Sequence, residues 1–110
     1  MNAKEELLSR LSRLHKEVKI IAAKIEVDLD WFDEGEILPQ KNHILKMGYS
    51  EEEFVKFLDG LETIEYDGYT RDIKGTVWLS DGSWMQRDWN DRGAWWERYA
   101  FPPIPKELIN

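Results

Sequence analysis

The chain of 110 residues contains no cysteine and only two histidines, His15 and His43. It therefore offers no disulfide, no zinc knuckle and no thiol nucleophile, and little imidazole for metal binding or acid–base chemistry. No apolar run approaches the roughly 20 residues that cross a bilayer, and the N-terminus lacks the hydrophobic region of a secretory signal. These absences predict a cytoplasmic protein that holds no metal or cofactor and does not associate with membranes.

Short motifs of the common enzyme classes are missing as well. The chain has no G-x-S-x-G, no P-loop, no G-x-G-x-x-G and no H-E-x-x-H. Pairs of carboxylates are unavoidable among 22 acidic residues, so such pairs do not indicate a hydrolase. The acidic run from Asp28 to Glu36 does not have the twelve-residue spacing of an EF-hand loop. We predict that the protein is not an enzyme and has no catalytic residue.

Basic residues are too few for a general nucleic-acid binder, because 15 Lys and Arg against 22 Asp and Glu give a net charge of −7. The acidic excess is concentrated in residues 25–67, whereas residues 1–24 are net basic. Such a stretch favours docking on a partner protein with a basic surface, although an acidic face also serves solubility alone. The predicted partner-binding residues are the acids of residues 26–36 and two aromatic anchors among them: Glu26, Asp28, Asp30, Trp31, Phe32, Asp33, Glu34 and Glu36.

Apolar residues of the N-terminal segment recur every three or four positions, as they do on one face of a helix. They are Leu7, Leu11, Leu14, Val18, Ile21 and Ile25. The pattern predicts a long amphipathic helix within residues 1–25, packed on the sheet of its own chain. The alternative is a homodimer joined along this stripe, since three heptads are the minimum for a helical seam.

A second helix is predicted near residues 50–62, after an acidic connecting segment at 26–49. Ser50 and Glu53 have the spacing of a capping box, in which each side chain bonds the backbone N–H of the other residue. The carboxylates of Glu51 and Glu52 suit the positive end of the helix dipole. This part of the acidic excess therefore also has a purely structural interpretation.

The last third of the chain predicts β-structure followed by a Pro-rich tail at residues 102–110. Runs rich in Trp, Val and Tyr indicate strands, separated by an Asp81-Gly82 turn and a longer loop. The three predicted strands are residues 73–79, 83–89 and 94–99. The expected fold is a single α+β domain with a long N-terminal helix, a second helix and a three-stranded antiparallel β-meander over residues 73–101.

The expected register distributes tryptophan over both faces of the meander. A two-residue Asp81-Gly82 turn places Trp78 opposite Met85, and the second loop places Arg87 opposite Trp96. One face then holds Trp78, Met85, Arg87, Trp96 and Arg98, and the other holds Val77, Leu79, Trp84, Trp95 and Tyr99. We expect both faces to be covered, one by helices and the other by the tail or a partner.

Residues 75–105 carry a family resemblance through three motifs. They are Gly75-Thr-Val-Trp-Leu-Ser-Asp-Gly-Ser-Trp84, Trp95-Trp96-Glu97 and Pro102-Pro103-Ile104-Pro105. This stretch resembles the tail of small uncharacterised bacteriophage and prophage proteins. The resemblance implies a protein of the host bacterial cytoplasm that works against host defences.

The function predicted from these observations is inhibition of a host defence protein by binding to it. The target is a nuclease, a restriction enzyme or a CRISPR component with a basic surface, so the protein is an anti-defence or anti-CRISPR inhibitor. An immunity protein against a basic toxin nuclease fits the same residues. The alternatives are a carbohydrate- or peptide-binding module that uses exposed tryptophans and a homodimeric accessory protein.

Overall fold

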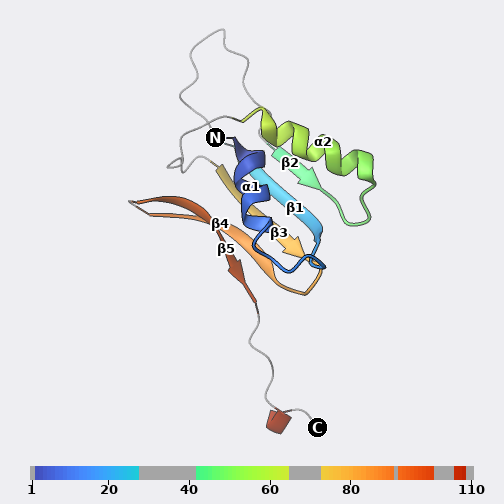
Figure 1. Ribbon diagram of the computed structural model, residues 1–110, viewed down its shortest axis with the longest axis vertical. Helices are drawn as coiled ribbons and strands as arrows, with labels where there is room; N and C mark the ends of the chain where they lie inside the picture. The colour runs from blue at the N-terminus through green and yellow to red at the C-terminus, as the bar shows by residue number, and fades with distance from the viewer. Residues whose placement is uncertain (1, 28–41, 65–72, 91, 101–105, 109–110) are drawn as a thin grey trace.

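An antiparallel sheet of five strands forms the centre of the protein, in the order β2-β1-β3-β4-β5 (Figure 1). The computed structural model describes residues 2–27, 42–64, 73–90, 92–100 and 106–108. The strands are β1 (Ile20–Val27), β2 (Asn42–Leu45), β3 (Ile73–Leu79), β4 (Trp84–Asn90) and β5 (Gly93–Tyr99). The helices are α1 (Ala3–Leu11), α2 (Glu51–Glu62) and the short 3₁₀ helix η1 (Lys106–Leu108). The predicted α+β class is confirmed.

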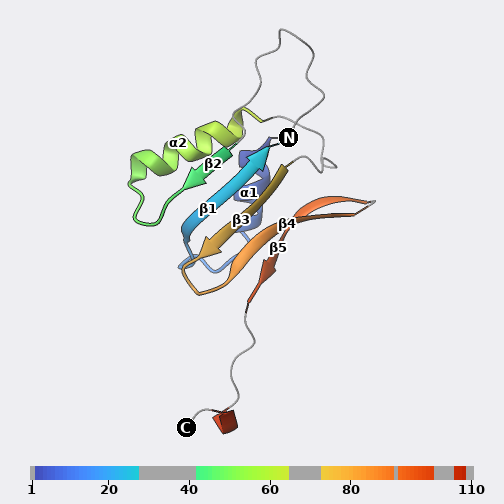
Figure 2. The same cartoon turned by 180° about the vertical axis from the view of Figure 1, so that it is seen from behind.

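Both α-helices lie on the same face of the sheet, as the views from its two sides show (Figure 2). Leu7 of α1 and Phe57 and Leu61 of α2 are buried in one core with residues from all five strands. The strand residues of this core include Ile25, Leu45, Val77, Met85 and Trp96. Within the described ranges, no element packs on the opposite face, and η1 contacts no other helix or strand. We call this opposite side the open face.

The N-terminal helix is shorter than predicted, because α1 ends at Leu11 and residues 20–27 form β1. Burial alternates along β1, where Ala23, Ile25 and Val27 are buried, and this two-residue period is that of a strand. β1 also pairs with strands on both sides, β2 and β3. Hydrogen bonding to two neighbours and burial of alternate residues override the helical spacing of the same apolar side chains.

The apolar stripe behind the homodimer alternative is consequently divided among three segments. Leu7 is buried on α1, and Leu14 and Val18 of the following connection pack at the margin of the core. Ile25 is buried on β1, whereas Ile21 is 38% exposed. The six residues thus form no single helical face, so the long helix on which the homodimer alternative rested is absent. Dimerisation itself stays a prediction.

The prediction of a three-stranded meander is wrong, because β1 and β2 extend the sheet to five strands. β3, β4 and β5 occupy the predicted strand positions within one residue at each boundary. β2 has only four residues and lies in the segment predicted to be a connection between helices. Its side chains alternate, with His43 and Leu45 buried, but so short a pattern is a weak sequence signal.

The pairing of β3 with β4 differs from the predicted register by one residue, because the turn between them is longer than expected. Leu79 N–H donates to the Ser83 carbonyl at 2.9 Å, so the loop contains three residues and ends at Gly82, with φ +86°. Trp78 is therefore opposite Trp84 and not Met85. A one-residue shift moves every side chain of a strand to the other face of the sheet.

The remaining local predictions agree with the structure. The second hairpin has the predicted register, with Arg87 opposite Trp96. α2 begins at the predicted capping box, in which the Ser50 side chain accepts from the Glu53 N–H and the Glu53 side chain accepts from the Ser50 N–H. In the part of the chain that the structure describes, no helix has the length and apolar character needed to cross a membrane.

Candidate binding surface

Four aromatic residues gather on the open face of β3, β4 and β5. The register places Trp78 opposite Trp84, and Trp84 opposite Tyr99, so these three form a row across the strands. Trp95 lies opposite Asp88 on the same face. Trp78, Trp95 and Tyr99 are 43%, 38% and 37% exposed, which is unusual for side chains of this size. We call Trp78, Trp84, Trp95 and Tyr99 the aromatic row.

Neighbouring side chains hold these rings in defined orientations. The rings of Trp84 and Tyr99 are stacked with their centroids 6.1 Å apart. The Tyr99 hydroxyl donates to Asp88, and the indole N–H of Trp95 donates to Glu97 Oε2 at 2.9 Å. The bond to Asp88 raises the pKa of Tyr99, because the carboxylate favours the protonated phenol. Rings fixed in this way lose little further conformational freedom when a ligand binds.

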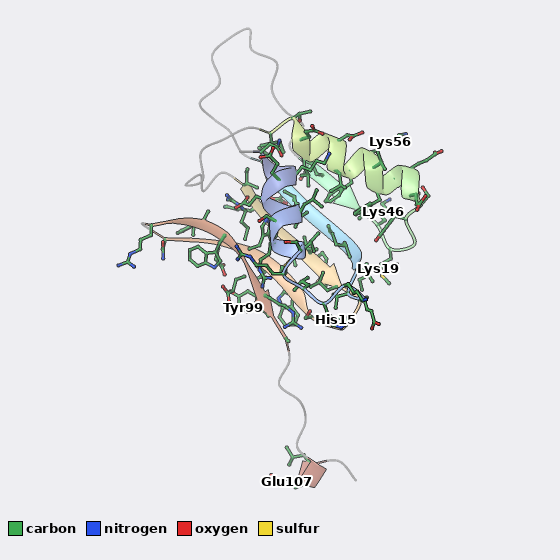
Figure 3. The ribbon with its side chains drawn as sticks, in the orientation of Figure 1. His15, Lys19, Lys46, Lys56, Tyr99 and Glu107 are labelled. Atoms are coloured by element: carbon green, nitrogen blue, oxygen red, sulfur yellow. The ribbon has the colours of Figure 1, made fainter. Side chains whose placement is uncertain are left out.

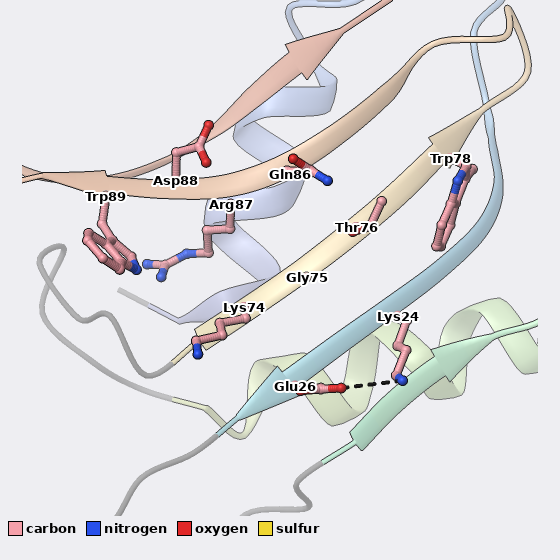
Figure 4. Close-up of a pocket in the computed structure, with 10 residues that line it drawn as sticks. All are labelled: Lys24, Glu26, Lys74, Gly75, Thr76, Trp78, Gln86, Arg87, Asp88 and Trp89. Atoms are coloured by element: carbon pink, nitrogen blue, oxygen red, sulfur yellow. Dashed lines mark ion pairs between the residues drawn. The ribbon is translucent and has the colours of Figure 1, made fainter.

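A groove of about 510 Å³ lies beside the aromatic row, over β1, β3 and β4 (Figure 4). Trp78 and Trp89 stand at its two ends, and polar side chains line the space between them (Figure 4). The lining contains both signs of charge, and Lys24 forms an ion pair with Glu26 at 3.3 Å. We call it the open-face groove. Its mixed lining suits a ligand that combines apolar surface with hydrogen-bonding groups.

Only one of the eight predicted partner-binding residues lies within the described ranges. Glu26 is exposed near the end of β1 and pairs with Lys24. The other seven lie outside the described residues: Asp28, Asp30, Trp31, Phe32, Asp33, Glu34 and Glu36. Their role stays a prediction, and the structure adds the aromatic row as a second candidate surface, of which Figure 3 labels Tyr99.

The aromatic row differs from the arrangement expected from the sequence because the turn between β3 and β4 is one residue longer than predicted. The expected register places Trp84, Trp95 and Tyr99 together, as the structure does, but its two-residue Asp81-Gly82 turn puts Trp78 on the other side. The additional residue of the loop is Ser80. Its hydroxyl accepts from the Lys19 N–H and holds the turn against the chain before β1. This contact joins residues 61 positions apart and is not visible in a local pattern.

Comparison of the chain with protein-family models, curated proteins and solved structures found no match. The resemblance of residues 75–105 to phage and prophage proteins therefore stays a prediction. The aromatic row and the open-face groove are identified by their own residues alone.

Proposed function

We propose that the protein is a non-enzymatic binding protein that docks on a partner protein through the aromatic row. The single observation that carries this proposal is the position of the row. Trp78, Trp84 and Tyr99 lie side by side on the open face, and two of them are more than one-third exposed. A contiguous aromatic surface of this kind marks an interaction site, because isolated monomers rarely leave one uncovered.

The composition of the face supports a protein partner. Binding hot spots are enriched in Trp and Tyr and are surrounded by a polar rim that excludes water. Here the aromatic row is bordered by Gln86, Asp88 and Glu97. Asp88 lies opposite Trp95, and Gln86 lies opposite Glu97. A mixed rim of this type gives orientation and specificity more than raw affinity.

We further propose that this partner is a host defence protein and that binding inhibits it. The support is the resemblance of residues 75–105 to phage and prophage proteins, whose motifs include Trp78, Trp84 and Trp95 of the row. The acidic segment contributes electrostatic attraction to a basic target, as the local charge excess predicts. Inhibition then follows from covering a functional surface of the target, without chemistry by this chain.

Affinity purification from bacterial lysate with matched variants tests the proposal. Trp78→Ala and Trp95→Ala each remove an exposed ring, and Val55→Ala removes an exposed apolar side chain from α2 as the control. We expect one protein to be retained by the wild type and Val55→Ala but lost from both Trp variants. Equal retention by all four proteins would exclude the aromatic row as the contact surface.

A separate variant tests the acidic segment. It replaces four carboxylates by lysine: D28K, D30K, D33K and E34K. We expect this variant to retain its thermal unfolding transition but to lose the partner, with the largest loss at low salt, where charge attraction is least screened. Unchanged retention would confine the contact to the aromatic row.

Saccharide binding is the second candidate, and the open-face groove is the observation that favours it. Trp78 and Trp89 offer apolar ring surfaces at the ends of a polar trough (Figure 4), and such rings bind ligands with one apolar and one polar side. A neutral oligosaccharide that quenches tryptophan fluorescence in the wild type but not in Gln86→Ala would support this function. No quenching across a glycan panel would exclude it.

A further inference from the structure

A second surface lies at the outer edge of β5, away from the open-face groove. β5 is the last strand of the sheet, and it pairs with β4 along all seven residues without a bulge. It contains neither proline nor lysine, two of the devices that block exposed strand edges. In the part of the chain that the structure describes, no strand pairs with its other side.

The orientation of the β5 backbone follows from the neighbouring hairpin. Because Leu79 and Ser83 share a backbone hydrogen bond, alternate residues of β4 from Trp84 onward direct their N–H and C=O groups toward β5. Their partners in β5 point inward, and the residues between them point outward. The outward residues are Ala94, Trp96 and Arg98.

An independent contact agrees with this orientation. The Nε of Arg10 on α1 donates to the carbonyl oxygen of Trp96 at 3.0 Å. One outward acceptor of the edge is thus bonded to a helix side chain, which fixes the guanidinium of Arg10 beside the strand. The N–H of Trp96 and both backbone groups of Ala94 and Arg98 also point to this edge.

A groove of about 590 Å³ runs between this edge and α1. Residues 94–97 of β5 form one wall, and Ser9, Arg10 and Arg13 of the α1 region form the other. We call it the edge groove. A strand edge on one side and a helix on the other is the arrangement in which domains accept an extended peptide as an added strand.

Two arginines and two glutamates line the edge groove, and each glutamate is already bonded to another side chain. Glu6 also lines it, but its Oε2 lies 3.1 Å from Nε of the buried Arg87 and is neutralised there. Glu97 lines the β5 wall of the groove and accepts from the Trp95 indole N–H. Arg13 is exposed, and Arg10 is held at the strand. The helix side of the groove is therefore basic, in a protein whose net charge is −7.

We propose that the edge groove binds an extended acidic peptide segment of a partner protein as a sixth strand of the sheet. The peptide backbone bonds Ala94, Arg98 and the N–H of Trp96, and its carboxylates contact Arg10 and Arg13. Guanidinium groups bind carboxylates with two parallel hydrogen bonds, which adds geometric selectivity to the charge attraction.

The backbone pattern distinguishes a peptide from other anionic ligands. The edge presents N–H donors and C=O acceptors at a two-residue repeat, and another extended main chain matches both. Phosphate groups of a nucleic acid only accept, so they leave the outward carbonyls without donors. A second copy of the chain paired along β5 brings its own basic α1 region to the groove, which charge disfavours.

Fluorescence anisotropy with two labelled peptides tests the proposal. The acidic probe alternates glutamate with threonine and valine, and the matched probe carries lysine in place of each glutamate. We expect saturable binding of the acidic probe alone, weakened by salt. Arg13→Glu is expected to weaken it by about tenfold or more, as expected for reversal of a charge that contacts the ligand. The control Lys46→Glu makes the same charge change outside the groove and is expected to weaken it far less.

Ala94→Pro tests the backbone contact independently of charge. It removes one outward N–H and leaves the inward ladder to β4 intact, a position where edge strands tolerate proline. We expect a retained unfolding transition and loss of acidic-probe binding. In the wild type, the amides of Trp96 and Arg98 are expected to exchange more slowly when the probe is bound.

Three results would overturn the proposal. The first is equal binding of both probes, or none, by folded wild-type protein. The second is an equal effect of Arg13→Glu and Lys46→Glu. The third is a concentration-dependent dimer that Ala94→Pro abolishes, which would assign the edge to a second copy of the chain. Trp95 belongs to both surfaces, whereas Trp78 does not line the edge groove, so Trp78→Ala and Arg13→Glu distinguish the two proposals.

Discussion

The indole of Trp96 on β5 reaches across β4 to the backbone of Gly75 on β3. A Cβ atom added at Gly75 would lie 3.0 Å from Cη2 of Trp96 and 2.9 Å from the carbonyl oxygen of Lys24. Trp96 is 4% exposed and belongs to the core beneath α1 and α2. The missing side chain of Gly75 therefore gives space to a ring from two strands away, which joins three strands of the sheet.

Gly75→Ala is expected to destabilise the protein by about 1–3 kcal/mol, the usual cost of overpacking a core. The added methyl group meets the backbone oxygen of Lys24, which cannot move without disturbing the pairing of β1 with β3. Urea denaturation measures the change, with Gln86→Ala on the open face as the control. A variant as stable as the wild type would show that the ring of Trp96 and the sheet adjust freely.

A buried ion pair connects α1 to the sheet. The side chain of Arg87 is fully buried, and its Nε lies 3.1 Å from Oε2 of Glu6, which is 13% exposed. Glu6→Ala is expected to cost about 3 kcal/mol or more, because it removes the carboxylate that pairs with Nε of a fully buried guanidinium. The exposed neighbour Glu5→Ala serves as the control and is expected to change the free energy of unfolding little.

A double-mutant cycle identifies the cause of that loss. The double variant Glu6→Ala/Arg87→Met is expected to lose less stability than the sum of the two single variants, since the two side chains interact directly, with Arg87 Nε 3.1 Å from Glu6 Oε2. Additive losses in urea denaturation would show that the two side chains stabilise the protein independently. Arg87 Nη1 also donates to the Ile73 carbonyl at 2.9 Å, and that bond is lost in both variants that lack Arg87.

Stability at acidic pH is expected to depend on Asp81 in the β3–β4 turn. Hydrogen bonds from the Ser83 hydroxyl and N–H, and the nearby Arg98, lower the pKa of Asp81 from 3.8 to about 2. Because the pKa of Asp81 is lower in the folded state, the stabilisation from its ionised carboxylate is complete above pH 3.8 and is lost as the pH falls toward 2. We expect Asp81→Asn to be less stable than the wild type at neutral pH, with the difference narrowing as the pH falls from 3.8 to about 2.

Chemical denaturation at a series of pH values checks this expectation. Asp59→Asn on the exposed face of α2 is the matched control, and its difference from the wild type is expected to stay small throughout. If the difference in free energy of unfolding between Asp81→Asn and the wild type persists at the acidic end of the series, the lost stability comes from packing of the turn and not from ionisation.

Local chemistry made some elements predictable from the sequence. Ser50 and Glu53 specify the start of α2 by side-chain bonds within four residues, and the structure has both bonds. The register of Arg87 with Trp96 was also predictable, since a short loop fixes it. Both depend on residues close together in the chain.

Long-range pairing explains the errors. Ile20–Val27 carries apolar residues that fit a helix, and only the presence of β2 and β3 on its two sides makes it a strand. The additional turn residue, Ser80, is bonded to Lys19, which is far away in the sequence. This one contact shifts the register of β3, and with it Trp78 moves to the open face. The aromatic row was therefore only partly predictable, and Trp78 was its missing member.

The tether between Tyr99 and Asp88 offers a direct test of order in the aromatic row. The bond to Asp88 raises the pKa of Tyr99, and the charge of Glu97 contributes least among its causes. Asp88→Asn is therefore expected to move the pKa of Tyr99 toward the ordinary value of 10.0, and Glu97→Gln is expected to move it less. The phenolate absorbance titration of each protein, minus that of its Tyr99→Phe counterpart, isolates this residue. If Asp88→Asn leaves the pKa of Tyr99 unchanged, the hydroxyl of Tyr99 is not bonded to Asp88, and only the stacking on Trp84 orients this ring.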